Sequence, residues 1–181
     1  DGTLKTPHVN LAGDFSITLW FWLGDPSGVS IRDGELVLLP NGKRVAYTMD
    51  ETGTSRLTLS GVFDNAVPTP GNTPLEPGAW HLMTLTQRGE TLSLFVNDGD
   101  SPEVSPLNVA PSGEAEIRFG NGLEGKLDEI ALFPHALTTE DRKALWVASD
   151  LARQQQQARA RDRKAEEALA VLSDPPRFPD S

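Results

Sequence analysis

The strongest constraint on the fold is the alternation of side chains over residues 15–23. Every second residue there is large and apolar, and the residues between them are hydroxyl-bearing or tryptophan. Successive side chains of a β-strand point to opposite faces, so this pattern predicts a strand with one face in a hydrophobic core. The core face holds Phe15, Ile17, Leu19, Phe21 and Leu23, and the other face holds Ser16, Thr18, Trp20 and Trp22.

Short segments of a similar kind recur along most of the chain, separated by turn residues. We expect further strands over residues 35–39, 43–49, 55–63, 80–88, 91–97, 114–119 and 125–133. Pro40-Asn41-Gly42 predicts a hairpin turn, because Asn-Gly readily adopts positive φ angles. Residues 64–78 contain four prolines, which cannot donate to a β-ladder, and predict a long exposed loop. Many short strands without intervening helices favour an antiparallel β-sandwich over an α/β fold.

Helix signals replace strand signals after Pro134. Thr138 is a suitable N-cap, and Asp141 follows at the spacing of a capping box. Neither Gly nor Pro interrupts residues 139–172, so the sequence predicts one long helix. Its first part is expected to dock on the sandwich through apolar residues at three-to-four spacing, namely Leu145, Ala148, Leu151 and Ala152.

The chain of 181 residues therefore divides into two expected parts. Residues 1–148 are expected to form the sandwich with the docked start of the helix, and residues 149–181 a solvated helix and a proline-rich linker. The net charge of −10 arises in the first part, because residues 150–181 carry 6 acidic and 6 basic side chains. An acidic surface repels phosphate groups, which argues against nucleic acid as a partner. No apolar run reaches the roughly 20 residues that span a bilayer, so membrane insertion is not expected.

Three motifs in a fixed order carry a resemblance to a known family. They are residues 13–20, the strand pair from Trp80-His81 to residues 92–97, and residues 125–133 followed by Ala136-Leu137-Thr138 and a helix. In this combination the chain resembles the laminin-G-like, concanavalin-type jelly-roll family. The resemblance implies an all-β, two-sheet jelly-roll β-sandwich with a C-terminal α-helix. It also implies a module that binds carbohydrate or protein partners within a secreted multidomain protein.

A carbohydrate site requires an exposed aromatic plane beside polar hydrogen-bonding groups. Trp20 and Trp22 lie on the strand face opposite the aliphatic residues, so they are the candidate ligand-binding residues. Packing beneath loops or the C-terminal helix is the alternative role for both, because large aromatic side chains are usually buried. Trp80 and Trp146 are interpreted as packing residues.

The titratable residues do not match a known catalytic arrangement. Retaining glycosidases use two carboxyl groups about 5 to 5.5 Å apart. Glu114 and Glu116 are expected to share a strand face. Hydrolases of the family that the chain resembles carry three interleaved acids, but here the third position, residue 118, is Arg. His81 shares strand parity with core residues and is interpreted as a packed, hydrogen-bonded histidine. The chain has no cysteine and no nucleophile-elbow motif, so we predict no enzyme activity.

The resemblance also implies a structural calcium site. Family members often place an aspartate at the start of the last strand, together with backbone oxygens near the N-terminal strand. Asp128 matches that position, and Asp14, or Asp1 with Gly2, would supply the remaining ligands. Calcium accepts oxygen ligands alone, including loop carbonyls. In the alternative, Asp128 accepts hydrogen bonds from neighbouring backbone amides and needs no ion.

These inferences together predict a non-catalytic binding module of a larger exported protein, with carbohydrate as the first ligand class. We expect an extracellular or periplasmic location, with any signal peptide upstream of the given sequence. The first alternative is a protein-interaction or structural spacer domain, whose long helix orients neighbouring domains of the same polypeptide. The second alternative is a glycan-degrading enzyme.

Overall fold

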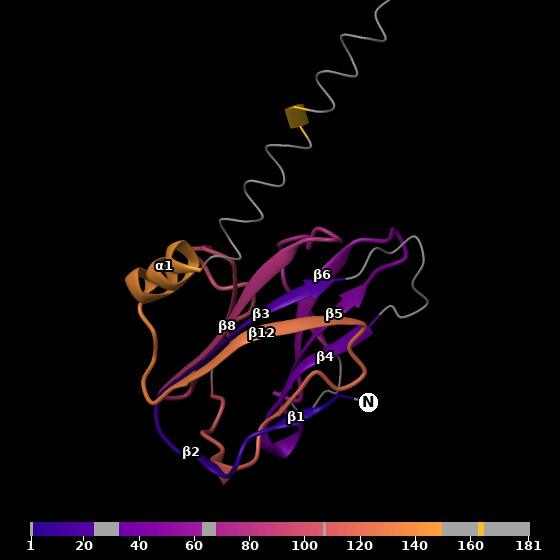
Figure 1. Cartoon of the computed structure of the whole chain (residues 1–181). Helices are drawn as coiled ribbons and strands as arrows, with labels where there is room; N and C mark the ends of the chain where they lie inside the picture. The colour runs from indigo at the N-terminus through magenta and orange to yellow at the C-terminus, as the bar shows by residue number, and fades with distance from the viewer. Residues whose placement is uncertain (1, 24–32, 63–67, 107, 150–162, 165–181) are drawn as a thin grey trace, which may run out of the picture.

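The computed structural model describes residues 2–23, 33–62, 68–106, 108–149 and 163–164. These residues form two facing antiparallel sheets, a short two-stranded sheet and the helix α1 (Thr139–Ala148) (Figure 1). The prediction of an all-β sandwich with a C-terminal helix is confirmed. Among the described residues, no helix has the length and apolarity needed to cross a bilayer.

The larger sheet has six strands in the order β1-β11-β4-β5-β6-β7. Their bounds are β1 Leu4–Lys5, β11 Arg118–Phe119, β4 Asp33–Leu38, β5 Arg44–Met49, β6 Ser55–Ser60 and β7 Thr69–Pro70. The second sheet has four strands in the order β12-β3-β8-β9, with bounds β12 Gly125–Phe133, β3 Phe15–Leu23, β8 Trp80–Arg88 and β9 Thr91–Val96. A separate pair joins β10 (Gly113–Ala115) to β2 (Val9–Leu11).

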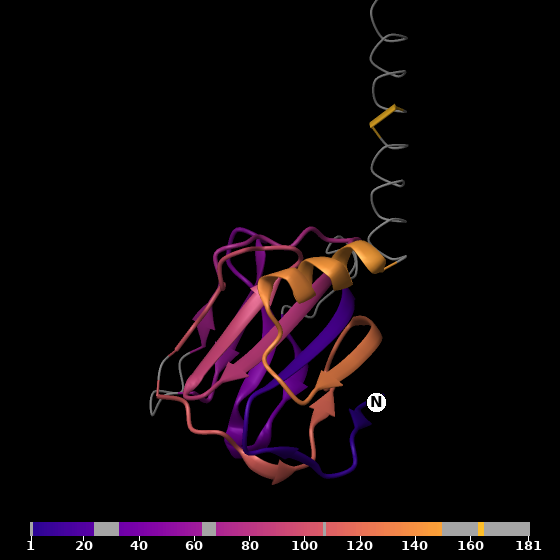
Figure 2. The ribbon, with the colours of Figure 1, turned by 90° about the vertical axis from the view of Figure 1, so that its left-hand side faces the viewer.

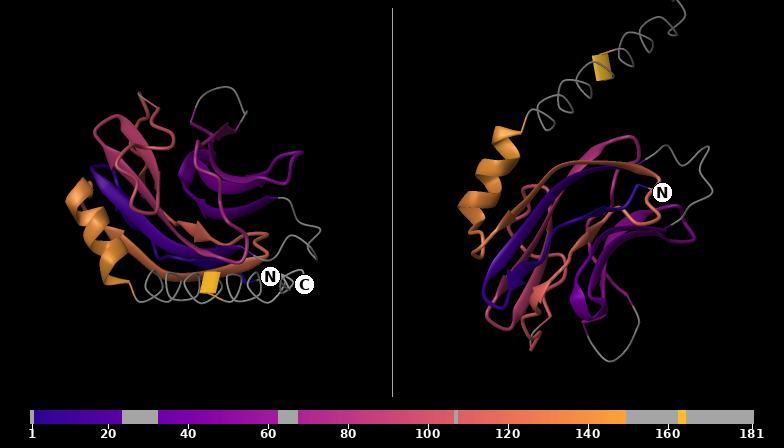
Figure 3. Two further views of the ribbon diagram at one scale, coloured as in Figure 1. Left: turned by 90° about the horizontal axis from the view of Figure 1, so that it is seen from above. Right: turned by 60° about the horizontal axis from the view of Figure 1, so that its bottom comes forward.

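The core lies between the six-stranded and four-stranded sheets, which face each other in Figure 3. The predicted inner face of β3 is confirmed, since Ile17, Leu19 and Phe21 are fully buried. They belong to one cluster with residues of the opposite sheet, including Leu36 and Leu57. Burial of each such side chain contributes about 1.5 to 3 kcal/mol to folding. The alternation in the sequence therefore sets both the strand and the layer it belongs to.

The predicted hairpin between β4 and β5 is confirmed, with a short 3₁₀ turn over Pro40–Gly42. Asn41 has φ 62° and Gly42 has φ 76°, the left-handed conformation for which these residue types are suited. The predicted long loop over residues 64–78 is exposed at most of its described positions, but it also contains a short strand and a buried residue. Thr69–Pro70 pairs with β6, and Leu75 is buried. Proline is tolerated in β7 because this strand is the edge of the sheet.

The predicted strand over residues 114–119 is divided in the structure. β10 pairs with β2, whereas β11 pairs with β1 and β4 of the six-stranded sheet. Glu116 and Ile117 lie between them in neither strand. Ile117 is fully buried, and its backbone N–H donates to the Thr6 hydroxyl at 3.0 Å. Pairing with an N-terminal segment distant in sequence therefore overrides the local strand pattern.

Helix α1 begins with the predicted capping box. The backbone N–H of Asp141 donates to the Thr138 hydroxyl at 3.2 Å, and the Thr138 N–H donates to the Asp141 carboxylate at 2.9 Å. The Thr138 N–H and the Thr138 hydroxyl both donate to the Asp141 carboxylate, and they hold the pKa of Asp141 below its usual value. The helix lies across the outer face of the four-stranded sheet (Figure 2).

The prediction of an uninterrupted helix to residue 172 is wrong, because α1 ends at Ala148. Ser149 has extended backbone angles, φ −73° and ψ 128°, and its N–H still donates to the Leu145 carbonyl. Ser and Asp favour helix ends through local side-chain hydrogen bonds, and the sequence continues Ser149-Asp150 at this point.

The docking face of α1 also differs from the prediction. Leu145 packs against the sheet, but Ala148 is exposed and Arg142 is buried instead. The predicted contacts of Leu151 and Ala152 lie outside the described residues, as does most of 149–181. The division of the chain at residue 148 therefore stays a prediction.

Candidate functional site

The outer face of the four-stranded sheet carries hydroxyl side chains at alternate positions. This follows from the strand period, because the apolar residues between them enter the core. The hydroxyl residues are Ser16, Thr18, Thr84, Thr86, Thr91 and Ser93. Part of this face is covered by α1, and part is open beside the start of the helix.

Trp20 lies beneath α1 and is 2% exposed. Its ring stacks on Trp146 of the helix, with 5.2 Å between ring centroids and 21° between ring planes. Leu82 and Leu145 belong to the same small cluster. Trp20 thus takes the alternative role, that of a packing residue.

Trp22 is half-buried, so it remains accessible in part. The ammonium group of Lys126 lies 5.0 Å from the centroid of its ring. A cation–π contact of this kind occupies one side of the ring. Trp22 is therefore the more accessible residue of the predicted pair, and the two rings do not form a shared exposed platform.

A cleft of about 500 Å³ opens between the start of α1, β9 and the loop after β9, and we call it the α1–β9 cleft. Ligand pockets in proteins commonly measure about 300 to 1,000 Å³. The lining is rich in hydroxyl groups and charges and consists of Thr86, Arg88, Thr91, Ser93, Phe95, Asp100, Pro102, Leu137, Thr138, Thr139, Glu140 and Arg142.

Arg142 is the most buried charge of the cleft, at 4% exposure. Its guanidinium carbon lies 3.6 Å from the ring centroid of Phe95, which forms a cation–π contact. One guanidinium N–H lies 3.3 Å from the Thr139 hydroxyl, to which it donates. Burial lowers the pKa of Arg142, while the negative charges of Asp100 and Glu140 act in the opposite direction.

The charged residues that line the cleft balance one another, so the lining is close to neutral. Arg88 and Arg142 face Asp100 and Glu140. Asp100 forms an ion pair with Lys143 at 2.7 Å, and this contact raises the pKa of Lys143. Neutral, hydroxyl-bearing ligands and ligands with a small charge are compatible with such a lining.

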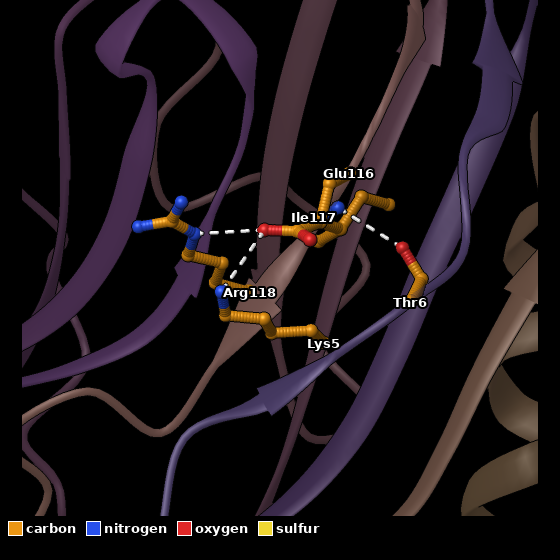
Figure 4. A network of polar contacts seen from close by, with 5 residues as sticks. All are labelled: Lys5, Thr6, Glu116, Ile117 and Arg118. Atoms are coloured by element: carbon orange, nitrogen blue, oxygen red, sulfur yellow. Dashed lines mark hydrogen bonds and ion pairs between the residues drawn. The ribbon is translucent and has the colours of Figure 1, made fainter.

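The predicted carboxylate pair does not form a catalytic arrangement. Glu114 lies in β10, and Glu116 points between Lys5 and Arg118 (Figure 4). The Glu116 carboxylate is 3.0 Å from the Arg118 guanidinium and 3.6 Å from the Lys5 ammonium. The hydrogen bond from Arg118, with the charge of Lys5, lowers the pKa of Glu116. A glycosidase acid needs a raised pKa, so Glu116 does not fit that role.

His81 occupies the predicted core position, at 3% exposure. Its Nε2 donates to the Glu76 carbonyl oxygen at 3.0 Å, and its ring lies 5.4 Å from that of Phe21. The interpretation of His81 as a packed, hydrogen-bonded histidine is confirmed.

The structure separates two of the predicted calcium ligands, Asp14 and Asp128. Asp128 of β12 pairs with Trp20 of β3. Trp20 lies six residues after Asp14 along the chain, and at the usual strand rise this separates the two aspartates by about 20 Å. Gly2 precedes β1 of the other sheet. The described residues contain no group of three acidic, histidine or cysteine side chains able to hold a metal.

Each of the two aspartates has a backbone partner instead. Asp128 accepts from the Glu129 N–H at 2.8 Å, as the alternative predicted, and Asp14 accepts from the Gly89 N–H at 2.7 Å. Asp1 lies outside the described residues, so a calcium site formed by Asp128 with Asp1 and Gly2 stays a prediction.

The sequence reasoning missed the α1–β9 cleft, although two signals were available. Thr84-Leu85-Thr86 and Thr91-Leu92-Ser93 alternate hydroxyl and apolar residues. Arg142 precedes Leu145 and Trp146 by three and four residues, which places it on the docking face of the helix. Both signals indicate a polar site between the sheet and the helix.

The fold is that of a lectin-like jelly-roll β-sandwich. The chain belongs to the Concanavalin A-like lectin/glucanases superfamily, whose model matches residues 1–141. A search of curated proteins finds no significant sequence match.

Solved structures with the same fold include three of different kinds. A native heptameric SAP-like pentraxin from Limulus polyphemus has a TM-score of 0.57 at 13% identity, covering 80% of this chain and 75% of its own. Domain 4 of AbnA, a GH43 extracellular arabinanase from Geobacillus stearothermophilus, was solved in complex with arabinotriose. It has a TM-score of 0.55 at 16% identity, and the match covers 78% of this chain and 70% of that domain. Trypanosoma rangeli sialidase has a TM-score of 0.53 at 15% identity, and the match covers 78% of this chain but 24% of the sialidase. At these identities the likeness shows the fold alone.

Proposed function

We propose that this domain is a non-catalytic carbohydrate-binding module of a larger exported protein, and that the α1–β9 cleft holds the sugar. The observation that carries the proposal is the lining of this cleft, which combines five hydroxyl residues with charged hydrogen-bonding groups. Sugars present many hydroxyl groups that both donate and accept, so such a lining matches their chemistry. The hydroxyl residues are Thr86, Thr91, Ser93, Thr138 and Thr139.

The family and its structural neighbours support this ligand class. Domain 4 of the arabinanase was solved with arabinotriose, and its parent enzyme is extracellular. Neighbours that are enzymes, such as the sialidase, are matched over a minor part of their length. The Glu116 ion pairs described above give no support to a glycosidase mechanism on this domain.

A glycan-array screen of the full chain, followed by titration of the bound glycans, tests the proposal. The double variant Arg88→Ala/Thr91→Val removes a charge and a hydroxyl from the cleft and is expected to weaken binding at least tenfold. Arg44→Ala/Thr48→Val removes the same groups from the six-stranded sheet, so it is the matched control and is expected to bind like wild type. Silence across the array, with all proteins folded, contradicts the proposed function.

Trp22→Ala separates the cleft from the other accessible candidate. Because Trp22 does not line the cleft, this variant is expected to keep wild-type affinity. If Trp22→Ala abolishes glycan binding and the cleft variant does not, the domain binds sugar but at the exposed side of Trp22.

A further inference from the structure

Arg142 occupies a position where helix packing favours an apolar side chain. Residues 142, 145, 146 and 149 repeat at three-to-four spacing and form the sheet-facing side of α1, with Leu145 and Trp146 in contact with the sheet. Arg142 is nevertheless 4% exposed. Burial of a charge is costly unless it is paired and hydrogen-bonded. This cost indicates that the guanidinium has a role beyond attaching the helix.

The hydrogen bonds of Arg142 are incomplete within the described part of the chain. A guanidinium has five N–H donors, and one of them reaches a hydroxyl, that of Thr139 at 3.3 Å. The Nε atom is buried without a partner. Asp100, the carboxylate with the largest effect on this group, is paired with Lys143 at 2.7 Å. No carboxylate of the described residues forms an ion pair with Arg142.

We propose that Arg142 anchors a carboxylate of the ligand, so that the sugar bound in the α1–β9 cleft is an acidic one, such as a uronic or sialic acid unit. This inference rests on the proposed function of the same cleft. The planar guanidinium matches a carboxylate with two parallel hydrogen bonds, which neutral hydroxyl groups do not reproduce. Phe95 packs against the guanidinium and limits its movement, so less freedom is lost when the ligand binds.

The charges around Arg142 favour one carboxylate over a dense polyanion. Asp100 and Glu140 line the same cleft and balance Arg88 and Arg142, so a ligand with many charges meets repulsion. The net charge of −10 adds to that repulsion at longer range. The hydroxyl lining also favours a sugar over an acidic peptide, since a peptide side chain offers fewer hydroxyl partners.

The test compares acidic oligosaccharides with their carboxyl-reduced forms, using the full chain and isothermal titration calorimetry. The probes are trigalacturonic acid, a glucuronic acid-terminated disaccharide and sialyllactose, each beside the counterpart in which the carboxyl group is reduced to an alcohol. For wild type, at least one acidic probe is expected to bind at least tenfold more tightly than its reduced form. Arg142→Met is expected to abolish this preference, so that the acidic probe binds no more tightly than its reduced form.

Two further variants show that the effect belongs to the guanidinium. Arg142→Lys keeps the charge but loses the two-pronged geometry, so an affinity between those of wild type and Arg142→Met is expected. Arg44→Met removes an arginine from the opposite sheet and is expected to keep the full preference. Circular dichroism and thermal melts of all variants confirm that they fold.

The outcomes separate this inference from the proposed function. Equal binding of acidic and reduced sugars, unaffected by Arg142→Met, overturns the inference but leaves a carbohydrate-binding module. Tighter binding of heparin or of an acidic peptide through Arg142 also overturns it. Failure of every neutral and acidic sugar to bind contradicts the proposed function itself.

Discussion

The two outer faces of the sandwich arise from the same alternation of side chains but become different surfaces. Within the described residues the face of the six-stranded sheet is polar and open, since α1 does not cross it, and it has a hollow of about 310 Å³ lined in part by Glu35, Arg44, Thr48 and Thr58. The face of the four-stranded sheet is crossed by α1 (Figure 2). There the helix buries Trp20 and forms one wall of the α1–β9 cleft.

The comparison shows how one helix beside a sheet face forms a cleft. A flat strand face presents its side chains in one plane, whereas a helix beside it adds a second wall and excludes water from the groups between them. Arg142 of α1 illustrates the effect, because its side chain is buried against Phe95 of β9. Arg44 on the other face is exposed and donates to the Ser60 hydroxyl at 2.9 Å. This difference is the reason that we propose the helix-covered face, and not the other one, for ligand binding.

The largest expected effect is on the contact that holds the helix in place. Trp20→Ala removes a buried ring and its stacking on Trp146, and is expected to lower the free energy of unfolding by about 3 to 5 kcal/mol. Thr48→Ala on the open face is the control, expected to change it by less than about 0.5 kcal/mol. Urea denaturation followed by tryptophan fluorescence and circular dichroism measures both. Comparable losses for the two variants contradict the difference between the faces.

The N-cap of α1 is expected to give an intermediate effect. Thr138→Ala removes the hydroxyl that accepts from the Asp141 N–H and is expected to cost about 1 kcal/mol. It also removes a hydroxyl from the cleft wall, so glycan affinity is expected to fall with it. Thermal melts and glycan titration of this variant test both effects, and a loss of stability without any change in binding argues against the helix start as a wall of the site.

The pH dependence of the same cap provides a separate test. The folded-state pKa of Asp141 is lowered by its bonds to Thr138, so its contribution to stability is present above the ordinary carboxyl pKa of about 3.9. That contribution is lost as the pH falls through the lower, folded-state value. Asp141→Asn is therefore expected to be less stable than wild type at neutral pH, and the difference is expected to shrink in acid. A difference that does not depend on pH contradicts the role of the ionised carboxylate.

The parts of the fold that the sequence predicts are those determined by local pattern. The bounds of β3, β8 and β12 agree with the predicted residues, because alternation and flanking turn residues point to the same ends. The capping box was equally predictable, since Thr138 and Asp141 are three residues apart.

The parts that could not be predicted depend on distant partners. Ile117 leaves the strand pattern because it bonds to Thr6, more than a hundred residues away. The predicted platform of Trp20 and Trp22 does not form because Trp20 packs against Trp146 of α1, and the strand pattern alone does not predict this contact. The cleft requires Arg142 and Phe95 to meet across two elements. The helix spacing places Arg142 on the docking face, but it does not identify Phe95 as its partner.

Arg142→Met is expected to have a small effect on stability, in contrast to its effect on acidic sugars. The variant loses the cation–π contact but also removes a buried charge with incomplete hydrogen bonds, and Met can pack on Phe95 through its sulfur. We expect the free energy of unfolding to stay within about 1 kcal/mol of wild type, or to rise by up to that amount. A loss as large as that of Trp20→Ala would show that Arg142 serves chiefly to attach the helix.

Calcium is expected to have the smallest effect on either face. Two of the predicted ligands, Asp14 and Asp128, are separated by about 20 Å in the direction of β3, and each already accepts a backbone hydrogen bond. Neither excess calcium nor a chelator is therefore expected to shift the melting temperature measurably. A protein that binds calcium only when folded gains stability with ion concentration, so a rise of several degrees in excess calcium would reveal a site. Asp128→Asn would then locate it: loss of the shift would place the ion beside β12, and retention would place it elsewhere in the chain.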